Sequence, residues 1–539
     1  MIQKEKILTY LFFIFFLFFG FSIFRDFGIS IDEDNSRTNG LVSLKYIIDF
    51  FYSENSIFLN NLQLLPNISE YNEQGNGVIF DLPLAFIELF FKIDDFRNIY
   101  LLRHLTTFII FYVSCIFFYK IVFQRYKSYF LSVLAVIFLI TSPRIFAESF
   151  YNTKDIGFMS LCIISTYYGI NFIKNQNPLS ILKFTLFAAL AIDARIIGIF
   201  LPFIFFLIYL IDVIRYEHKN KKILLNTSLF FVSLFLFIIF FWPYLWSSPL
   251  ENFLEILKKL SVYAFPIKNF YMGSYINAMY VPWHYNLTWI FITTPLPYLF
   301  FFIFGFYSLF KRTLIRLLKI EKEKNYNDLW RSLNESYDLI FLLCLIIPLF
   351  TVIILNSSLY TGWRHFYFIY PYIILIAIYG VRILQLFYIK NKKILTVFCL
   401  ISILPSLIWQ FENHPHQNIY FNYLLKNKFD KYFDVDYWGV TNYQTLLELA
   451  KNSKKKIVIK QIGDGDLLLT KKFLPKEYRD KIRISFNINE ADFLLDNFNR
   501  WNGIKRLKNQ DYINDNFDIF YELKIGKIPI NRIYKRTNY

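Results

Sequence analysis

Long apolar blocks separated by short polar segments run along most of the chain. Eleven of them lie at 7–24, 99–119, 128–141, 156–173, 180–192, 196–211, 223–243, 290–310, 338–355, 366–387 and 394–410. A helix of roughly 20 apolar residues crosses a bilayer core about 30 Å thick, so each block is interpreted as a membrane span. The blocks 128–141 and 180–192 are short for this distance, and we expect them to extend into their flanks or to be broken helices.

Composition excludes two other classes of protein. Of the 539 residues, 55% are apolar and the mean hydropathy is +0.36. Both values are too high for a single soluble domain, and a disordered chain would be poor in aromatic and aliphatic residues. The four cysteines lie inside apolar blocks without a C-x-x-C pair, so neither a disulfide framework nor a zinc knuckle is predicted.

Basic residues set the predicted orientation. With eleven spans the two termini face opposite sides of the membrane. Segments on the side of the N-terminus contain 22 Lys and Arg, whereas the longer segments on the other side contain 12. Since basic residues mark the cytoplasmic side, we place the N-terminus in the cytoplasm and the tail outside, and we expect a bacterial inner membrane with a periplasmic tail. The net charge of +17 is therefore interpreted as evidence of membrane topology before any other cause, and nucleic acid is not an expected partner.

The last part of the chain has a different pattern of apolar and charged residues. Over 411–539, short apolar runs alternate with charged residues, with helix-like pieces between them. This predicts a small extracytoplasmic α/β domain that follows a transmembrane domain over 1–410. The predicted fold class is an α-helical polytopic membrane protein with a small C-terminal α/β domain. The loops 25–98, 142–155 and 244–289 are expected to carry the chemistry on the outer face.

Ionisable residues crowd these outer loops. Asp32 and Glu33 follow the first span, and a tight turn between two spans contains Arg195. The remaining candidates lie in the second loop and at the mouth of the tenth span: Arg144, Glu148, Lys154, Asp155, Arg364 and His365. Charged groups at membrane depth are costly and are therefore functional candidates.

Each of these residues also has a purely structural interpretation. The acidic residues could cap a helix, Arg144 and Lys154 could reach lipid headgroups, and Asp193 could pair with Arg195 at a helix break. His365 has no Cys or His companion nearby, so no metal site is predicted. A joint function is favoured because carboxylates and at least four cations face the same side, whereas the inner loops lack clustered acids.

A carboxylate beside several cations on an outer membrane surface suits one chemistry in particular. Cations can hold the phosphate of a lipid-borne ester and stabilise the charge that grows on it as it leaves. A carboxylate can accept the proton of an incoming hydroxyl. No nucleotide reaches the outside, so a sugar donor there would have to be lipid-linked.

At these positions the chain resembles the GT-C superfamily of integral-membrane glycosyltransferases. Within it, the chain is similar to glycosyltransferase family 39, the protein-mannosyltransferase and aminoarabinose-transferase branch. The resemblance rests on Asp32–Glu33, SPRIFAESFYNTKDIGF, WHYNLTWIFITTPLP, GWRHFYFIYP, HPHQNIYFNYL and FDVDYWGVTNYQ. These segments keep the same order and the same predicted side over most of residues 1–445.

The resemblance implies an inverting hexosyl- or pentosyltransferase with a polyprenyl-phosphate sugar donor and no metal or other cofactor. The acceptor would be a protein, a lipid or a glycan. By position, Asp32 corresponds to the catalytic base, with Glu33 as second choice or orienting group. The donor phosphate would be held by Arg144, Lys154, Arg195 and Arg364. Glu148, Asp155 and His365 complete the expected substrate site.

Two other functions compete with this one. A transporter or lipid flippase usually has repeat symmetry and ionisable or broken segments near mid-membrane. Here the charges cluster at one face and no internal symmetry is apparent. A structural subunit would not need acids and cations gathered together.

Overall fold

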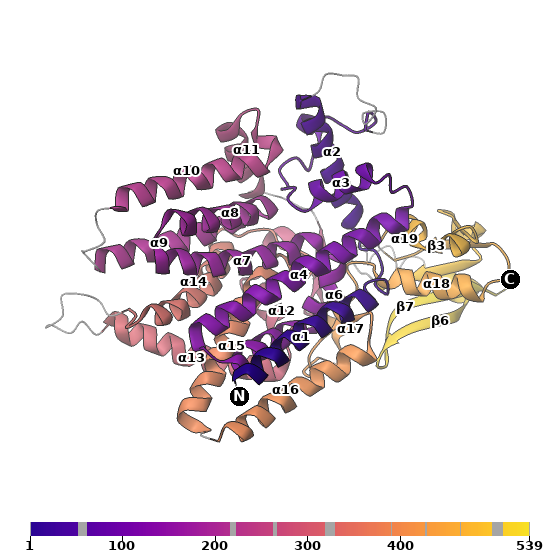
Figure 1. Ribbon diagram of the computed structural model, residues 1–539. Helices are drawn as coiled ribbons and strands as arrows, with labels where there is room; N and C mark the ends of the chain where they lie inside the picture. Colours follow the sequence, from indigo (N-terminus) through magenta and orange to yellow (C-terminus); the bar gives the residue numbers. More distant parts are fainter. Residues whose placement is uncertain are drawn as a thin grey trace.

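A bundle of long helices with a small sheet domain at one end forms the molecule (Figure 1). The computed structural model describes residues 2–51, 62–215, 222–261, 267–318, 329–389, 391–425, 428–463, 465–498 and 510–537. Within these ranges nine helices are long and apolar enough to cross a membrane. They comprise α1 (Ile2–Ile23), α4 (Phe96–Tyr126), α7 (Thr153–Asn175), α9 (Phe200–Arg215), α10 (Ile223–Phe241), α13 (Leu296–Leu318), α14 (Leu333–Ile354), α15 (Tyr370–Ile383) with η7 (Arg364–Ile369) before it, and α16 (Lys392–Glu412). The predicted polytopic membrane class is confirmed.

The two short apolar blocks are helices whose shapes fit the expectation. The helix α5 (Tyr129–Ile140) has only 12 residues, and α6 (Pro143–Tyr151) follows it at an angle of 70°. Pro143 lies at the first position of α6, where its missing N–H is not needed. The helix α8 (Pro178–Ala194) extends the block 180–192 at both ends, and its start is fixed by a capping box of Asn177 and Ser180.

One predicted span begins at the wrong residue. The block 290–310 is divided into α12 (Tyr285–Thr293) and α13, with the extended backbone of Thr294 between them. Pro295 follows Thr294, and a residue before proline is biased away from helical backbone. The span therefore runs from Leu296 to Leu318, and it ends eight residues after the last residue of the predicted block 290–310.

Two glycines allow α13 and α15 to pack backbone against backbone. A Cβ on Gly305 would lie 2.2 Å from the carbonyl oxygen of Ile376, and one on Gly380 would lie 2.3 Å from that of Phe301. Small residues permit such close approach between membrane helices. The helix that follows Arg364 is therefore held tightly against its neighbour.

The loops predicted to lie on the outer face form further helices and a hairpin beside the long helices. These are α2 (Glu33–Phe51), α3 (Asp81–Phe90) and α11 (Pro249–Ser261), together with a hairpin of β1 (Lys268–Tyr271) and β2 (Ser274–Asn277). In Figure 1 α2 and α3 stand beside the outer end of α4.

The C-terminal domain is a five-stranded sheet with helices. Its order is β4 (Ile482–Ile484), β3 (Ile457–Gln461), β5 (Phe493–Asp496), β7 (Ile528–Arg536) and β6 (Phe517–Ile525). The strand β3 runs parallel to β4 and β5, whereas β7 is antiparallel to β5 and β6. Helices α18 (Thr441–Asn452) and α19 (Leu467–Phe473) pack on it. The α/β class of the tail is confirmed, whereas the boundary at residue 410 stays a prediction.

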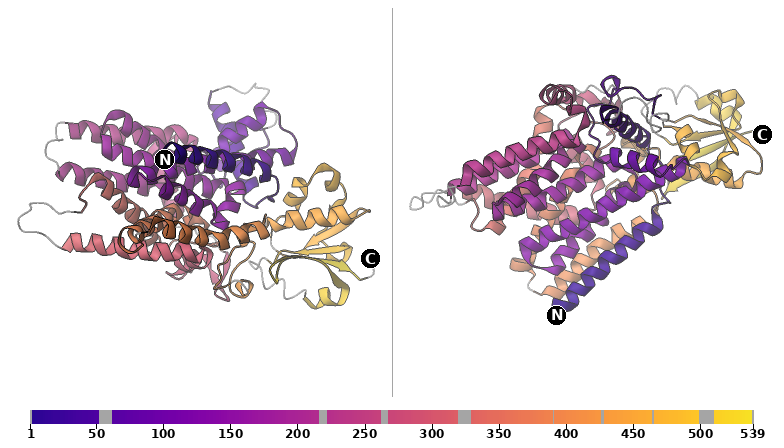
Figure 2. Two further views of the ribbon diagram at one scale, coloured as in Figure 1. Left: turned by 60° about the horizontal axis from the view of Figure 1, so that its bottom comes forward. Right: turned by 45° about the horizontal axis from the view of Figure 1, so that its top comes forward.

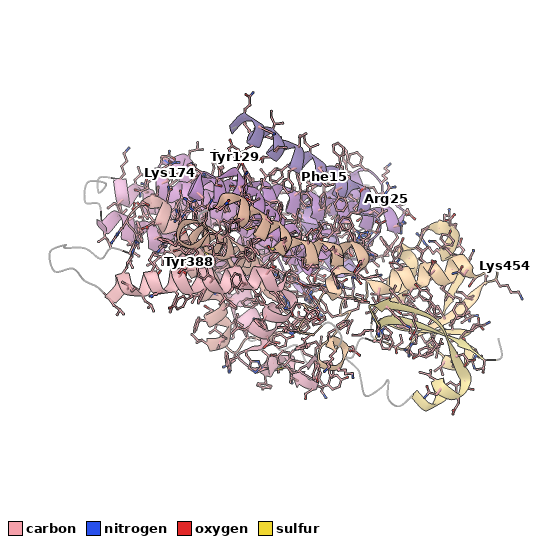
Figure 3. All side chains as sticks on the ribbon, turned by 90° about the horizontal axis from the view of Figure 1, so that it is seen from below. Phe15, Arg25, Tyr129, Lys174, Tyr388 and Lys454 are labelled. Atoms are coloured by element: carbon pink, nitrogen blue, oxygen red, sulfur yellow. The ribbon has the colours of Figure 1, made fainter. Side chains whose placement is uncertain are left out.

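The N-terminus and the sheet domain lie toward opposite ends of the helix bundle. The N-terminus begins α1 at the end of the bundle remote from the sheet domain (Figure 2). Lys174 and Tyr388 lie toward that remote end, whereas Arg25 lies next to the domain that carries Lys454 (Figure 3).

We expect reporters fused to the two termini to lie on opposite sides of the membrane. A cytoplasm-active reporter should function at the N-terminus, and a periplasm-active reporter should function after residue 539, because the eleven spans predicted from the sequence would place the termini on opposite sides. The measurement is reporter activity in whole cells, with each reporter tested at both ends. Activity of one reporter at both termini would contradict the eleven-crossing topology.

Candidate functional site

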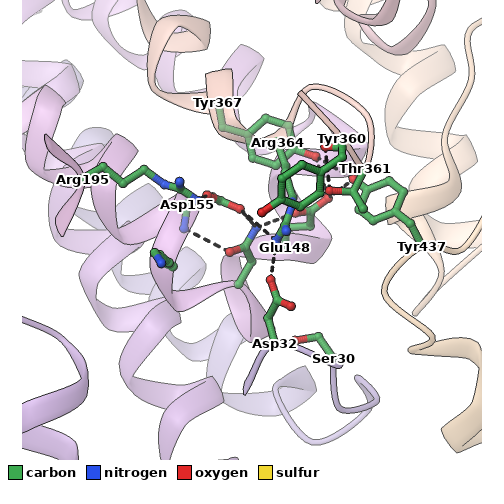
Figure 4. A network of polar contacts seen from close by, with 12 residues as sticks. Ser30, Asp32, Glu148, Asp155, Arg195, Tyr360, Thr361, Arg364, Tyr367 and Tyr437 are labelled. Atoms are coloured by element: carbon green, nitrogen blue, oxygen red, sulfur yellow. Dashed lines mark hydrogen bonds and ion pairs between the residues drawn. The ribbon is translucent and has the colours of Figure 1, made fainter. Parts of the chain in front are cut away.

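An ion pair between Arg364 and Asp32 joins the first loop to the segment that precedes α15 (Figure 4). Nη1 of Arg364 donates to Oδ2 of Asp32 at 2.5 Å and lies 3.8 Å from Oδ2 of Asp155. The side chain of Arg364 is 8% exposed, whereas that of Asp32 is 43% exposed. A buried cation thus holds a carboxylate that remains open to water.

Asp155 binds a second arginine. It lies in the first turn of α7, whose N-cap residue Asn152 accepts from the Asp155 N–H at 3.0 Å. An acidic residue is favoured there by the helix dipole. Arg195, the C-cap residue that directly follows α8, forms an ion pair with Asp155. The suggested pairing of Arg195 with Asp193 is wrong, because Asp193 is buried and accepts from the N–H of Ile79 at 2.8 Å.

Glu148 continues this network away from the water-exposed side. Its carboxylate accepts from Tyr367 Oη at 2.6 Å, Tyr437 Oη at 3.1 Å and Asn152 Nδ2 at 2.7 Å. The same Asn152 amide donates to Asp155 at 3.0 Å. Glu148 is fully buried, and its hydrogen bonds hold the neighbouring Tyr367, Tyr437 and Asn152 side chains in position.

Arg144 lies apart from the Arg364 pair. It is buried in α6, its Nε donates to the carbonyl of Tyr420 at 3.0 Å, and its guanidinium lies 5.3 Å from the Trp289 ring and 4.8 Å from the Phe421 ring. Its Nη1 and Nη2 atoms have no hydrogen-bond partner among the described residues. Two donors of a buried cation are therefore available to another group.

Lys154 and His365 lie at the edges of the network. Nζ of Lys154 donates to Oδ1 of Asn76 at 2.8 Å, and the His365 ring meets the Tyr360 ring edge-on at 4.7 Å. In the part of the chain that the structure describes, no group of three or more His, Cys, Asp or Glu could hold a metal ion.

Glu33 points away from the exposed side of Asp32. It is 4% exposed, its Oε2 accepts from the N–H of Ser30 at 2.7 Å, and its Oε1 lies 3.0 Å from Nε2 of His104. These contacts tie the start of α2 to α4. Glu33 therefore lacks the exposure that Asp32 has as a catalytic candidate. Its contacts hold the segment that carries Asp32 in position.

Comparison with known proteins gives a structural likeness. No protein-family model matches the chain, and no curated protein matches it significantly. Among solved structures the chain is similar to ArnT from Cupriavidus metallidurans bound to undecaprenyl phosphate. The TM-score is 0.46 and the identity 8%, over 97% of this chain and 97% of that chain.

Of the aromatic residues in the site, Tyr360 was missed by sequence reasoning, and Trp438 was noted only within the segment FDVDYWGVTNYQ, without a role. The Arg364 guanidinium lies 4.5 Å from the Trp438 ring and 5.3 Å from the Tyr360 ring. In a chain with 66 Phe and 40 Tyr, an aromatic residue carries little signal of its own. Tyr360 lies four positions before Arg364 in the sequence, but nothing in the sequence joined Trp438 to this arginine.

A second ionic cluster beside α2 and α3 was also missed. Arg37 pairs with Glu88, and Arg103 of α4 lies 3.8 Å from Asp81 and 3.9 Å from Glu88. Burial raises the pKa of Asp81 from 3.8 to about 6, against the opposing effect of Arg103. These residues are dispersed over 67 positions of sequence, so their meeting required the folded arrangement of the first loop.

We expect Asp81→Asn to stabilise the protein above about pH 6 and to have little effect near pH 4. The raised pKa means that ionised Asp81 costs the folded state free energy at high pH, and this cost disappears as the carboxyl becomes protonated. A shift from 3.8 to about 6 corresponds to about 3 kcal/mol. The measurement is thermal melting in detergent at pH 8 and pH 4. The exposed Asp518→Asn is the control, and an equal change for Asp81→Asn at both pH values would contradict the assignment.

Proposed function

We propose that the protein is a membrane glycosyltransferase that moves a sugar from a polyprenyl-phosphate donor to an acceptor hydroxyl at the outer face. The observation that carries this proposal is the water-exposed Asp32 carboxylate held by the buried Arg364 guanidinium. A second arginine and a second carboxylate, Arg195 and Asp155, adjoin this pair. Acid–base and phosphate-binding groups therefore lie together at one end of the bundle.

The cations suit a phosphate that becomes a leaving group. Arg364 and Arg195 offer planar guanidinium groups, which can bind phosphate through two parallel hydrogen bonds. In their low-dielectric surroundings such charges stabilise developing negative charge more than they would in water. The lysine Lys154 lies one residue before Asp155 and adds a further positive charge at this site.

Donor binding would also release the base. One oxygen of Asp32 accepts a hydrogen bond from Arg364. A donor phosphate that binds Arg364 competes with Asp32 and frees its oxygen to accept a proton. The acceptor oxygen then forms a bond to the anomeric carbon, the bond from that carbon to the phosphate oxygen breaks with its electron pair, and the hydroxyl proton passes to Asp32. Attack opposite the leaving phosphate inverts the anomeric centre.

A cavity near this site suits the hydrocarbon chain of the donor. Its volume is about 570 Å³, and it lies between the segment 279–287 and the outer end of α14. Apolar side chains such as Val281, Val352 and Leu359 line much of it. Leu359 precedes Tyr360, whose ring contacts Arg364. A lipid chain in this cavity would bring its phosphate toward the arginine.

We expect Arg364→Ala to lower turnover by about 10²–10³-fold, because it removes a preorganised charge from the leaving phosphate. Arg364→Lys should restore activity only in part, since an ammonium cannot make two parallel bonds. The measurement is transfer of labelled sugar at saturating and at limiting donor. Arg483→Ala is the matched control, because that arginine is 74% exposed on the outer domain and pairs with Glu490 at 3.8 Å. Normal turnover of Arg364→Ala under both conditions would show that Arg364 does not act on the phosphate.

The variant Asp32→Asn should bind donor and lose turnover by about 10²–10⁴-fold, the usual effect of losing a general base. The side chain keeps its shape, and only its ability to accept the proton is removed. Purified protein in nanodiscs is assayed for sugar transfer and, separately, for donor binding, with Asp518→Asn as control. Near-normal turnover would refute Asp32 as the base. Donor translocation without any transfer by the wild-type protein would favour the transporter or flippase alternative.

A further inference from the structure

A short segment of the tail reaches back into the site from outside the bundle. Residues 436–441 form a turn between the outer end of the bundle and α18. Within it Oδ2 of Asp436 accepts from the N–H of Thr441 at 2.9 Å and from its hydroxyl at 2.5 Å. Nδ2 of Asn531, in β7, donates to the same hydroxyl at 2.9 Å. The turn is thus fixed internally and tied to the sheet of the outer domain.

Trp438 in this turn contacts Arg364 and the residue that precedes Asp32. Its indole ring lies 4.5 Å from the Arg364 guanidinium. Its carbonyl accepts from the N–H of Ile31 at 3.2 Å, one residue before Asp32. One residue of the tail therefore holds the carboxylate segment through its backbone and the arginine through its side chain.

Close packing around the turn restricts the position of Trp438 relative to the first loop. A Cβ on Gly28 would lie 2.3 Å from the carbonyl oxygen of Val440, so the first loop and the tail touch backbone to backbone. On the other side of Trp438, Oη of Tyr437 donates to Glu148 at 3.1 Å. The contacts form a closed circuit from Arg364 through Asp155, Asn152, Glu148 and the tail back to Arg364.

We propose that Trp438 is a positioning residue that sets Arg364 against Asp32, so that the site is complete only when the outer domain is docked. This rests on the proposed transferase function. A guanidinium stacked on an indole face keeps its in-plane N–H donors free for carboxylate or phosphate. The ring fixes the plane of Arg364 without occupying the donors that the reaction uses. This gives the outer domain a direct part in the chemistry.

Two substitutions of Trp438 separate positioning from simple packing. Trp438→Phe keeps an aromatic face, whereas Trp438→Leu introduces a side chain somewhat smaller than phenylalanine that has no aromatic face. If the ring positions Arg364, the Leu variant should lose about tenfold or more in kcat/KM for the donor, and the Phe variant should stay within about threefold of wild type. If Trp438 only fills space, the two variants should behave alike.

A second readout does not depend on catalysis. Hydrogen–deuterium exchange of peptides that cover 28–36 should be faster in Trp438→Leu than in wild type, because the carbonyl that accepts from Ile31 is less firmly held. Trp438→Phe should restore the protection. All variants are studied as the full chain in nanodiscs.

The control is another contact between the bundle and the outer domain. Arg97 of α4 donates to the carbonyl of Phe473 at 2.8 Å and lies 4.9 Å from its ring. Because Arg97→Gln leaves Trp438 in place, exchange over 28–36 should rise less in this variant than in Trp438→Leu. Equal exchange and equal kinetics in the Phe and Leu variants would overturn the proposal for Trp438. If the wild-type protein transfers no sugar, the proposed function fails, and the exchange data alone decide whether Trp438 positions the first loop.

Discussion

A guanidinium withdrawn from water needs carboxylates around it, and Arg364 imposes this requirement on the outer end of the bundle. Its charge is compensated by Asp32 from the first loop and Asp155 from the start of α7. An isolated buried ion would cost several kcal/mol, so these segments must meet if the fold is to form. The same requirement brings Asp32, Asp155, Arg195 and Arg364, to which we assign the proposed chemistry, within one small volume.

Much of the bundle could be predicted because membrane spans leave a direct record in sequence. A stretch of apolar residues long enough to cross the bilayer has few alternatives to a helix. The short blocks at α5 and α8 were recognised for the same reason. The start of α13 was not, because one proline ended an apolar run that hydropathy alone treats as continuous.

The candidate site could be predicted only as a set of residues on one face. Which residues pair depends on the directions in which helices end. Arg195 follows Asp193 by two positions, yet it turns to Asp155, because α8 ends in extended backbone at Arg195. Neighbouring carboxylates likewise separate at the start of α2, where Asp32 faces Arg364 and Glu33 faces His104. The contribution of Trp438 required knowledge of how the tail folds back on the first loop, which no local pattern encodes.

The separation of Asp32 and Trp438 along the chain has a consequence for biosynthesis. Chains are made at about 5–20 residues per second, so Trp438 emerges roughly 20–80 s after Asp32. During that interval the first loop has already been delivered to its side of the membrane, while its partner in the tail does not yet exist. A ribosome that stops after α16 but before Trp438 leaves a protein that has its membrane helices and lacks the residue that contacts Arg364. Termination in this interval therefore leaves the insertion of the membrane helices unchanged and affects only the assembly of the site.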